Sequence, residues 1–382
     1  MSGPLTPAVV CGFLVSLSAQ PPAERIDPAT QPGTGGDQRT RNLMSPDGVS
    51  RPPKGGAGAE NAALEGEITP ELTAAVDRGL AALASMQNDD GSFGQGRFGK
   101  NVAVTSLACL AFMSDGHVPG RGRYGPVVEK GLRYVLSCSS ETGLIAGDSI
   151  NGPMYGHGFA TLFLGEVYGM TQGGGDTALA DRVHDALVRA CTLIERTQND
   201  EGGWRYNPVP FDADVSVTIC QIMGLRSARN AGLEVPRSTI DKAVTYVRDC
   251  QLPDGGFKYQ KDSGVSAWPR SAAGVASLYY AGVYDDPATR RGVAYLLRAG
   301  MPGSALRTEA HYFYGMYYTA QSMYLSGGDA WRAWWPEARK ELLSRQGGGG
   351  EWTDTGVGSA YGTSMALIVL QMPKRYLPIF QK

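Results

Sequence analysis

Segments rich in charge alternate with segments almost free of it from about residue 68 to the end of the chain. The charge-rich segments carry Arg, Lys, Asp and Glu on one face, which is typical of helices that expose this face to water. The segments between them read, for example, SVTICQIMGL in 216–225 and GTSMALIVLQM in 362–372. A helix that is apolar all round is buried on every side. Because no segment shows sustained alternation with a hairpin turn, the pattern predicts an all-α fold of exposed and buried helices.

Start signals place six helices in each class. The first exposed helix begins at Thr69-Pro70-Glu71, which offers an N-cap, a proline at the first helical position and an acid in the first turn. The exposed helices are expected to start near Pro70, Pro126, Ala178, Pro236, Pro287 and Pro336. The buried helices are expected to start near Asn101, Tyr155, Asp214, Pro269, His311 and Tyr361.

A recurring turn separates the two helices of each pair. It reads QNDDGSF in 87–93, QNDEGGW in 198–204 and QLPDGGF in 251–257, and degenerate copies stand at 138–144 and 346–352. The sixth unit lacks the turn signature but keeps its helices. The turns recur roughly every 45–60 residues, which is the range of a helix-pair repeat. The sequence therefore predicts an α6/α6 toroid, a double ring of about twelve helices in which the buried helices form a barrel and the exposed ones surround it.

The chain before the repeats has a different character. Residues 8–19, AVVCGFLVSLSA, have the length of a signal-peptide core, although no positive charge precedes them. Residues 20–67 are rich in Pro, Gly and scattered charge, and we expect them to be a disordered linker. The predicted organisation is a candidate signal peptide in 1–19, a linker in 20–67 and the toroid in 68–382. Export to the periplasm or the medium is the expectation, and a cytoplasmic protein with a start codon placed too early is the alternative.

Composition excludes several function classes. The net charge is −2 and there is no basic run, so nucleic-acid binding has no electrostatic support. The six cysteines stand at unrelated spacings without a C-x-x-C pair and do not form a disulfide framework. After the N-terminal stretch nothing approaches the ~18 uninterrupted apolar residues of a membrane span.

The three best turns follow the pattern Q-x-x-[DE]-G-[GS]-[WF], and they resemble the QW repeats of squalene-hopene cyclases and protein-prenyltransferase β subunits over about residues 68–382. The stretches MYGHGFATLFLGEVYGM, GGWRYNPVPFDADVSVT and RYLPIFQK make the chain more closely similar to bacterial prenyltransferase/squalene-oxidase-repeat proteins of undefined activity. The resemblance implies the toroid fold and a structural role for the turn Gln and aromatic residue. It does not imply a reaction.

Aligned against each other, the buried helices predict a ring of polar residues at one end of the barrel. DVSVT in 214–218 matches NVAVT in 101–105 and HGFAT in 157–161. In this register the first positions are Asn101, His157, Asp214, Arg270, His311 and Tyr361, with Tyr155, Asp212, Trp268 and Glu309 two residues upstream in their units. Six helix N-termini at one mouth favour an anionic group there. One turn further on the register mostly gives small residues, which predicts an open axial cavity.

The residue types suggest roles at this mouth. Asp214 and Asp212 are candidates for an acid or base, and His157 and His311 for proton transfer. Arg270 is a candidate for binding a head group, and Tyr314 and Tyr318 for binding an apolar body. The remaining candidate ligand-binding residues are Asn101, Tyr155, Trp268, Glu309 and Tyr361. A purely structural interpretation stands beside each role, because Asn101 and Asp214 are good N-caps, a lone histidine is usually a hydrogen-bonded one, and tyrosines pack in cores.

Neither motif of the resembling enzymes is complete. Class II terpene cyclases carry D-x-D-D-T, and here 212–216 reads DADVS while 214–218 reads DVSVT. The prenyltransferase zinc site needs an Asp and a Cys close together on a buried helix. Cys220 is six residues from Asp214, about 240° around the helix, so the two do not share a face. The sequence predicts no metal and no cofactor, and it leaves open whether the protein is an enzyme.

These observations lead to a functional hypothesis with two alternatives. The protein is expected to bind, with a chemical reaction left open, an extended apolar, isoprenoid-like ligand with a polar or anionic head in a central cavity. The partner would then be a small or lipid-like molecule, with membrane contact peripheral at most and the oligomeric state not predicted. The alternatives are an exported glycan-processing toroid of the lyase or hydrolase kind, and a non-catalytic interaction domain.

Overall fold

Helices make up the regular structure of this protein in the computed structural model, which describes residues 66–147, 152–171, 177–303, 306 and 308–381. The candidate signal peptide and nearly all of the predicted linker lie outside these residues. Charged helices are α2 (Pro70–Ser85), α4 (Gly125–Ser137), α6 (Thr177–Arg196), α8 (Arg237–Asp249), α10 (Pro287–Ala299) and α12 (Gly328–Ser344). The helices between them are α3 (Val102–Met113), α5 (Met154–Thr171), α7 (Val215–Asn230), α9 (Trp268–Tyr280), α11 (Tyr312–Ser326) and α13 (Ser359–Gln371).

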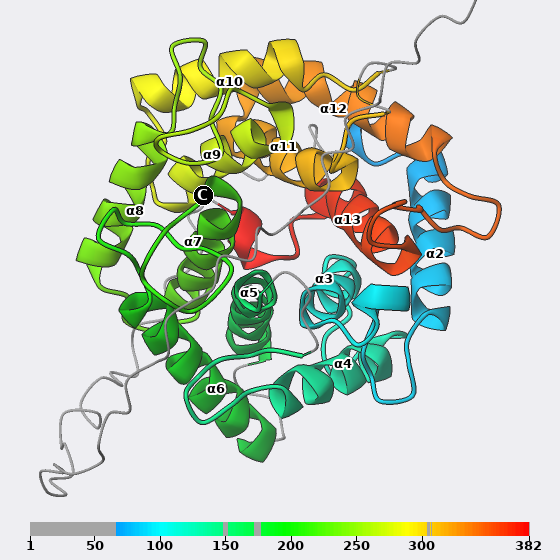
Figure 1. Cartoon of the computed structure of the whole chain (residues 1–382). Helices are drawn as coiled ribbons and strands as arrows, with labels where there is room; N and C mark the ends of the chain where they lie inside the picture. The colour runs from blue at the N-terminus through cyan, green and yellow to red at the C-terminus, as the bar shows by residue number, and fades with distance from the viewer. Residues whose placement is uncertain (1–65, 148–151, 172–176, 304–305, 307, 382) are drawn as a thin grey trace, which may run out of the picture. The chain divides into compact units, whose positions relative to one another are not determined.

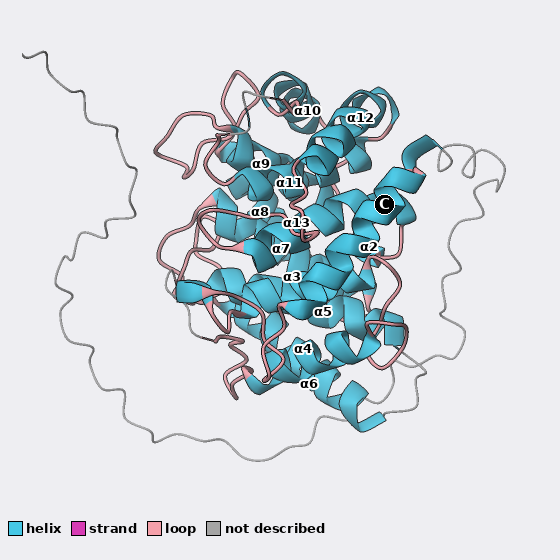
Figure 2. Ribbon diagram, turned by 90° about the vertical axis from the view of Figure 1, so that its right-hand side faces the viewer, coloured by secondary structure: helices cyan, strands magenta, loops and turns pink. Residues whose placement is uncertain are grey.

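The charge-poor helices form a closed inner ring. Each packs against the next, and α13 packs back against α3 (Figure 1). Most residues of α3, α7 and α13 are buried, as their largely apolar composition requires. The charged helices surround this ring, and α2 contacts α12 and α13 where the first and last units meet. Only helices, short 3-10 turns and loops appear among the described residues (Figure 2). The predicted α6/α6 toroid is confirmed.

One predicted helix start is wrong. The helix expected near Pro336 begins at Gly328 as α12 and contains Pro336 in its interior. A proline there removes one backbone hydrogen bond and is usually costly. The side chains of Trp331, Trp334 and Trp335, which precede Pro336 in the helix, are buried. Their burial stabilises the helix in spite of the proline.

The turns join successive outer helices. In four of them the glutamine amide donates one hydrogen bond within its own turn and one to a carbonyl near the start of the next outer helix. These glutamines, each with the carbonyl that it reaches on the next helix, are Gln87 with Val127, Gln198 with Thr239, Gln251 with Ala288 and Gln346 with Ala75. The distances are 2.8 to 2.9 Å. Both hydrogens of each half-buried amide are thus hydrogen-bonded, and the second bond fixes the position of one repeat relative to the next.

Aromatic side chains of α11 cross the inside of the inner ring. The Tyr318 hydroxyl lies 3.5 Å from Cys220 Sγ on α7, and the ring centroids of Tyr317 and Phe159 on α5 are 6.3 Å apart. Neither α5 nor α7 is a neighbour of α11 in the ring, so these contacts span its interior. All four side chains are buried. The expected open axial cavity is therefore wrong at this level, where the aromatic groups fill the space.

The C-terminal segment is packed against the same interior. The 3-10 turn Pro378–Phe380 contacts α7 and α11, and the Ile379 amide donates a 3.1 Å hydrogen bond to Glu166 on α5. Leu377, Ile379 and Phe380 are buried.

Candidate functional site at the mouth of the inner ring

A buried carboxylate begins α7. Asp214 is its N-cap, and Oδ1 accepts a 2.9 Å hydrogen bond from the Val217 amide. The other oxygen, Oδ2, is buried without a hydrogen-bond partner and lies 3.9 Å from Arg205 Nε. Arg205 also pairs with Asp212, at 2.9 Å between Nη1 and Oδ2. One guanidinium is therefore held by two carboxylates, of which Asp214 is fully buried and Asp212 is 46% exposed.

Tyrosine rings surround this guanidinium. The Arg205 Cζ lies 5.0 Å from the ring centroid of Tyr206 and 5.7 Å from that of Tyr259. The two tyrosine hydroxyls hydrogen-bond to each other. The ring of Tyr155, on the first turn of α5, is 6.0 Å from Tyr206. At such distances the faces of the tyrosines stabilise the cation and shape its surroundings.

Backbone bonds between loops hold these groups in place. The Met154 amide donates to the Tyr206 carbonyl at 3.1 Å, and the Val215 amide donates to the Tyr259 carbonyl at 3.0 Å. The mouth is thus built from the ends of α5 and α7 and from the two loops that follow turns of the repeat. Rigid elements of this kind can position polar groups for a ligand.

Burial sets the protonation behaviour of the site. It raises the pKa of Asp214 to about 6, although the Val217 amide and the Arg205 charge act in the opposite direction. It also raises the pKa of Tyr155, with the Asp214 charge adding to the effect. Asp214 therefore exchanges its proton close to neutral pH, which is a property of groups that act as acids or bases.

Further tyrosines continue the mouth towards the axis. Tyr314, on the first turn of α11, donates a 3.3 Å hydrogen bond to the Ser216 carbonyl, and its ring is 4.7 Å from that of Tyr318. Burial raises the pKa of Tyr314, and the charges of Asp214 and Tyr361 add to this. Tyr155, Tyr314 and Tyr361 keep part of their surface exposed, whereas Tyr318 is fully buried beneath them. The structure thus brings Asp212, Asp214, Tyr155, Tyr314 and Tyr361 together.

The predicted register is wrong for His157. This residue is the fourth of α5 and is fully buried; its Nδ1 accepts from the Ile145 amide at 3.2 Å and its Nε2 lies 3.3 Å from the Ala190 carbonyl. Burial lowers its pKa to about 4, so the imidazole is neutral with its proton on Nε2. His157 therefore lies one turn away from the predicted mouth position and links the inner ring to the turn before it and to α6.

The residues equivalent to His157 make the reason clear. In α3 and α7 the hydroxyls of Thr105 and Thr218 accept the amide of the turn aromatic residue, Phe93 or Trp204. His157 performs this role for Ile145, so it aligns with Thr105 and Thr218, and Pro153 aligns with Asn101 and Asp214. Asn101 is itself an N-cap, accepting from the Val104 amide at 3.1 Å.

The other predicted residues are spread around the mouth. Arg270, on the first turn of α9, donates to the Val265 carbonyl at 2.7 Å, and burial lowers its pKa while the charges of Tyr259 and Glu309 raise it. His311 precedes α11 in a left-handed conformation, with φ 64°, and is exposed. Trp268 is buried and donates to the Thr319 hydroxyl at 2.8 Å, so it links α9 to α11. Arg270 and Glu309 thus adjoin the tyrosine group, while Trp268 is part of the core.

Sequence reasoning missed Arg205, Tyr206 and Tyr259, although a signal was present. The turn aromatic is followed by a cation and a tyrosine in two consecutive repeats, Trp204-Arg205-Tyr206 and the equivalent 257–259. Equivalent positions of neighbouring repeats lie side by side in a toroid, which predicts that the two tyrosines meet. Among the described residues no group of three or more His, Cys, Asp or Glu is placed to hold a metal ion.

No protein-family model matches the chain, and no curated protein matches it. Among solved structures, an inactive variant of the α-1,6-mannanase GH76A of Salegentibacter sp. HEL1_6, in complex with α-1,6-mannotriose, has a TM-score of 0.59 at 7% identity, with 78% of this chain and 98% of that chain covered. The type II terpene cyclase MstE from Scytonema has a TM-score of 0.55 at 15% identity, covering 81% and 100%.

A third structure, the GH76 α-mannanase BT2949 of Bacteroides thetaiotaomicron, has a TM-score of 0.56 at 9% identity, covering 82% of this chain and 98% of its own. At these identities the similarity shows the fold, an α/α toroid, and nothing about the ligand. None of the helices that the structure describes is long and apolar enough to cross a membrane.

Proposed function

We propose that this toroid binds a carbohydrate at the mouth of its inner ring, with Arg205 and Asp212 as polar contacts and tyrosine rings as the apolar surface. The observation that carries the proposal is the pair of carboxylates on one guanidinium among tyrosines. Sugars present hydroxyls around an apolar ring face, and ligand sites in general combine aromatic walls with a few placed polar groups. The ring of Phe211, 87% exposed in the same loop, offers a further contact surface.

The exposed carboxylate of the pair could also take part in the cleavage of glycosidic bonds. Such reactions use two carboxyl groups, one of which has a raised pKa and delivers the proton. Asp214 has the raised pKa of about 6, and Asp212 is the more exposed carboxylate. In the proposal Asp212 faces the sugar, and Asp214, which is fully buried, holds Arg205 in place, so that a cleavage reaction would take its proton from another group or from solvent. Export, which residues 8–19 predict, would bring the protein to extracellular glycans.

The experiment is a binding screen on the purified protein with neutral and acidic oligosaccharides, α-1,6-mannotriose among them, by calorimetry. Arg205→Ala and Asp212→Asn are expected to weaken binding of any oligosaccharide that binds by at least about tenfold, because each removes a charged hydrogen bond. Arg237→Ala, in an exposed ion pair on α8, serves as the matched control and should bind normally. Product analysis on the same oligosaccharides shows whether a bond is cleaved. Binding that the mouth variants leave unchanged would contradict the proposal.

A specific observation also favours an isoprenoid-like ligand as second candidate. MstE has been solved in complex with geranylgeranyl dihydroxybenzoate, and the tyrosine faces of α11 could pack along such a chain. For this chain, however, an extended ligand would have to displace Tyr317 and Tyr318 from the interior of the ring. Mass spectrometry of lipid extracted from the purified protein tests it. If neither sugar nor lipid binds, the non-catalytic interaction domain becomes the better explanation.

A further inference from the structure

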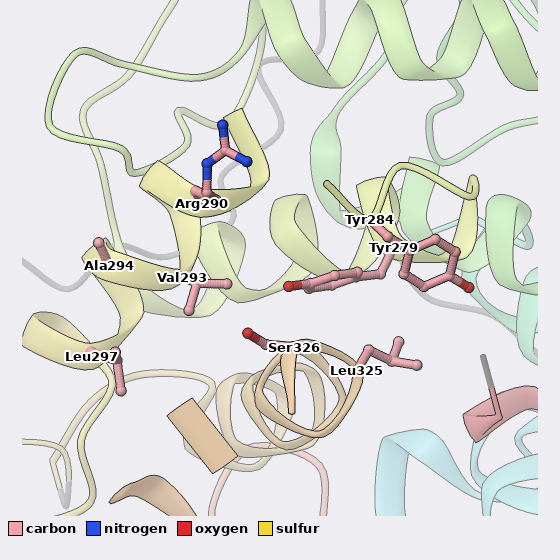
Figure 3. Close-up of a pocket in the computed structure, with 8 residues that line it drawn as sticks. All are labelled: Tyr279, Tyr284, Arg290, Val293, Ala294, Leu297, Leu325 and Ser326. Atoms are coloured by element: carbon pink, nitrogen blue, oxygen red, sulfur yellow. The ribbon is translucent and has the colours of Figure 1, made fainter. Parts of the chain in front are cut away.

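A hollow of about 300 Å³ lies between α9, α10 and α11, away from the mouth (Figure 3). Its position is at the C-terminal ends of two inner helices, whereas the mouth is at their N-termini. The lining residues are Tyr279, Tyr284, Arg290, Val293, Ala294, Leu297, Leu325 and Ser326. The volume is at the lower end of the range of small-molecule sites.

The hollow has a structural cause in the way α11 ends. Helices α7 and α9 are each followed, two residues after their last residue, by a glycine with positive φ, Gly232 at 97° and Gly282 at 87°. The next residues, Leu233 and Val283, donate their amides to carbonyls five residues back. Both side chains pack against the core. An apolar residue at this place of the helix C-cap normally covers the last turn.

Helix α11 lacks this cover. It ends at Ser326, its C-cap is Gly327 with φ 70°, and the next residue is Gly328, the first of α12. A Cβ at Gly328 would meet no atom within 4 Å. Leu325, which is only 2% exposed, and Ser326 border the hollow at the last turn of α11, where no apolar side chain follows directly in the sequence.

The lining separates into an apolar and a polar part. Val293, Leu297 and Leu325 provide apolar walls, and the side-chain hydroxyls of Tyr279 and Ser326 face each other within the hollow (Figure 3). At the rim stands Arg290, paired with Asp285, and both side chains are largely exposed. An exposed ion pair is worth little, so the guanidinium can exchange its partner for a ligand carboxylate.

We propose that this hollow is a binding site for a medium-chain alkyl carboxylate, whose chain packs on the apolar walls and whose carboxylate pairs with Arg290 at the rim. Arginine binds carboxylates with two parallel hydrogen bonds, which favours this head group over an alcohol or an amine. The site is independent of the carbohydrate mouth, since the two share no residue.

Calorimetric titration with octanoate, octanol and octylamine tests the proposal on the full chain. The expected order of affinity is octanoate, then octanol, then octylamine, with one octanoate bound per chain. Arg290→Gln should weaken octanoate by about tenfold and leave octanol unchanged, because only the charged contact is lost.

Blocking the hollow gives the sharper test. Ala294 is exposed at its edge, and Ala294→Trp should abolish octanoate binding with an unchanged melting temperature. Ala81→Trp, at an exposed alanine of outer helix α2, should bind octanoate normally. Equal binding by the Ala294 variant, or no octanoate binding at millimolar concentration by the unaltered protein, would overturn the proposal.

Discussion

Glu166 shows how burial turns one side chain into a pH-dependent contact. It lies on α5, where its carboxylate accepts the Ser227 hydroxyl at 2.7 Å and the Ile379 amide at 3.1 Å. Burial raises its pKa from 4.5 to about 7 in spite of these two bonds. Between these pH values the folded protein holds a proton that the unfolded chain has released. The contribution of Glu166 to stability therefore falls as the pH rises from about 4.5 to 7.

Replacing Glu166 by Gln should remove this dependence. We expect the free energy of unfolding of the unaltered protein to change with pH more steeply than that of Glu166→Gln, by about 2–3 kcal/mol between pH 5 and pH 8. Urea denaturation of both proteins at the two pH values measures it. Gln offers a single acceptor for two donors and lowers stability at every pH, but this offset cancels in the comparison. Parallel pH profiles would show that Glu166 does not titrate in this range.

Asp214 allows its capping and its charge to be separated. Asp214→Asn keeps a side-chain oxygen for the Val217 amide, so the free energy of unfolding at pH 7 should stay within about 1 kcal/mol of the original. Asp214→Ala removes the cap and should cost about 1 kcal/mol more. Chemical denaturation gives both values. A loss of several kcal/mol in the Asn variant would mean that the Arg205 pair is needed for folding, which the proposal does not expect.

Individual residues were predictable from sequence where their role depends on neighbours along the chain. Asn101 and Asp214 are N-caps, and this follows from their place before apolar helices. His157 was misplaced because its imidazole Nδ1 accepts the same amide that a threonine hydroxyl accepts in α3 and α7. The sequence match of HGFAT with NVAVT aligns His157 with Asn101 and hides the replacement of the threonine by the histidine. A residue type alone does not show which backbone group its side chain bonds.

At the level of helices and turns, the glutamines join each outer helix to the next. The side chain of Gln251 donates to Gly255 and Ala288 at 3.1 and 2.9 Å. Replacing it by Ala removes both bonds and leaves half-buried carbonyls without that donor, so we expect a loss of about 1–2 kcal/mol. Thermal and urea unfolding measure the change. Gln95→Ala, at an exposed glutamine, is the control and should be neutral; equal effects of the two variants would contradict the proposed role of the turn.

Helix boundaries were predictable wherever a repeat keeps its turn. The α12 start was missed because a proline ordinarily marks the first turn of a helix, and here tertiary packing of three tryptophans carries the helix through Pro336. The unit before it has no turn glutamine. There the Trp334 side chain donates to the Gly300 carbonyl at 2.9 Å and connects α12 to α10 instead. A contact of this kind between distant residues has no local signal in the sequence.

For the whole toroid, the ring closure followed from counting repeats, but the contents of the ring did not. Six buried helices at even spacing predict a barrel, and the register predicts which residues lie at its mouth. The same small residues, Thr105 and Thr218 among them, turn towards the amides of the turns and not towards the axis. The interior is filled by long aromatic side chains of one helix, α11, whose reach across the ring no nearest-neighbour pattern reveals.

The C-terminal segment completes this filling, so its removal should affect the whole molecule. Leu377, Ile379 and Phe380 are buried, and side chains of this size stabilise by about 1.5–3 kcal/mol each. A chain ending at Gln371 would lose a sum comparable to the total stability of an ordinary domain. We expect it to lose its cooperative melting transition, or to melt far below the full chain, and to bind an apolar dye. Tyr376→Ala, at a side chain of the same segment that is 51% exposed, is the control and should melt normally. If the shortened chain melted like the full one, the aromatic groups of α11 alone would support the ring, and the segment would be free to serve as a removable cover.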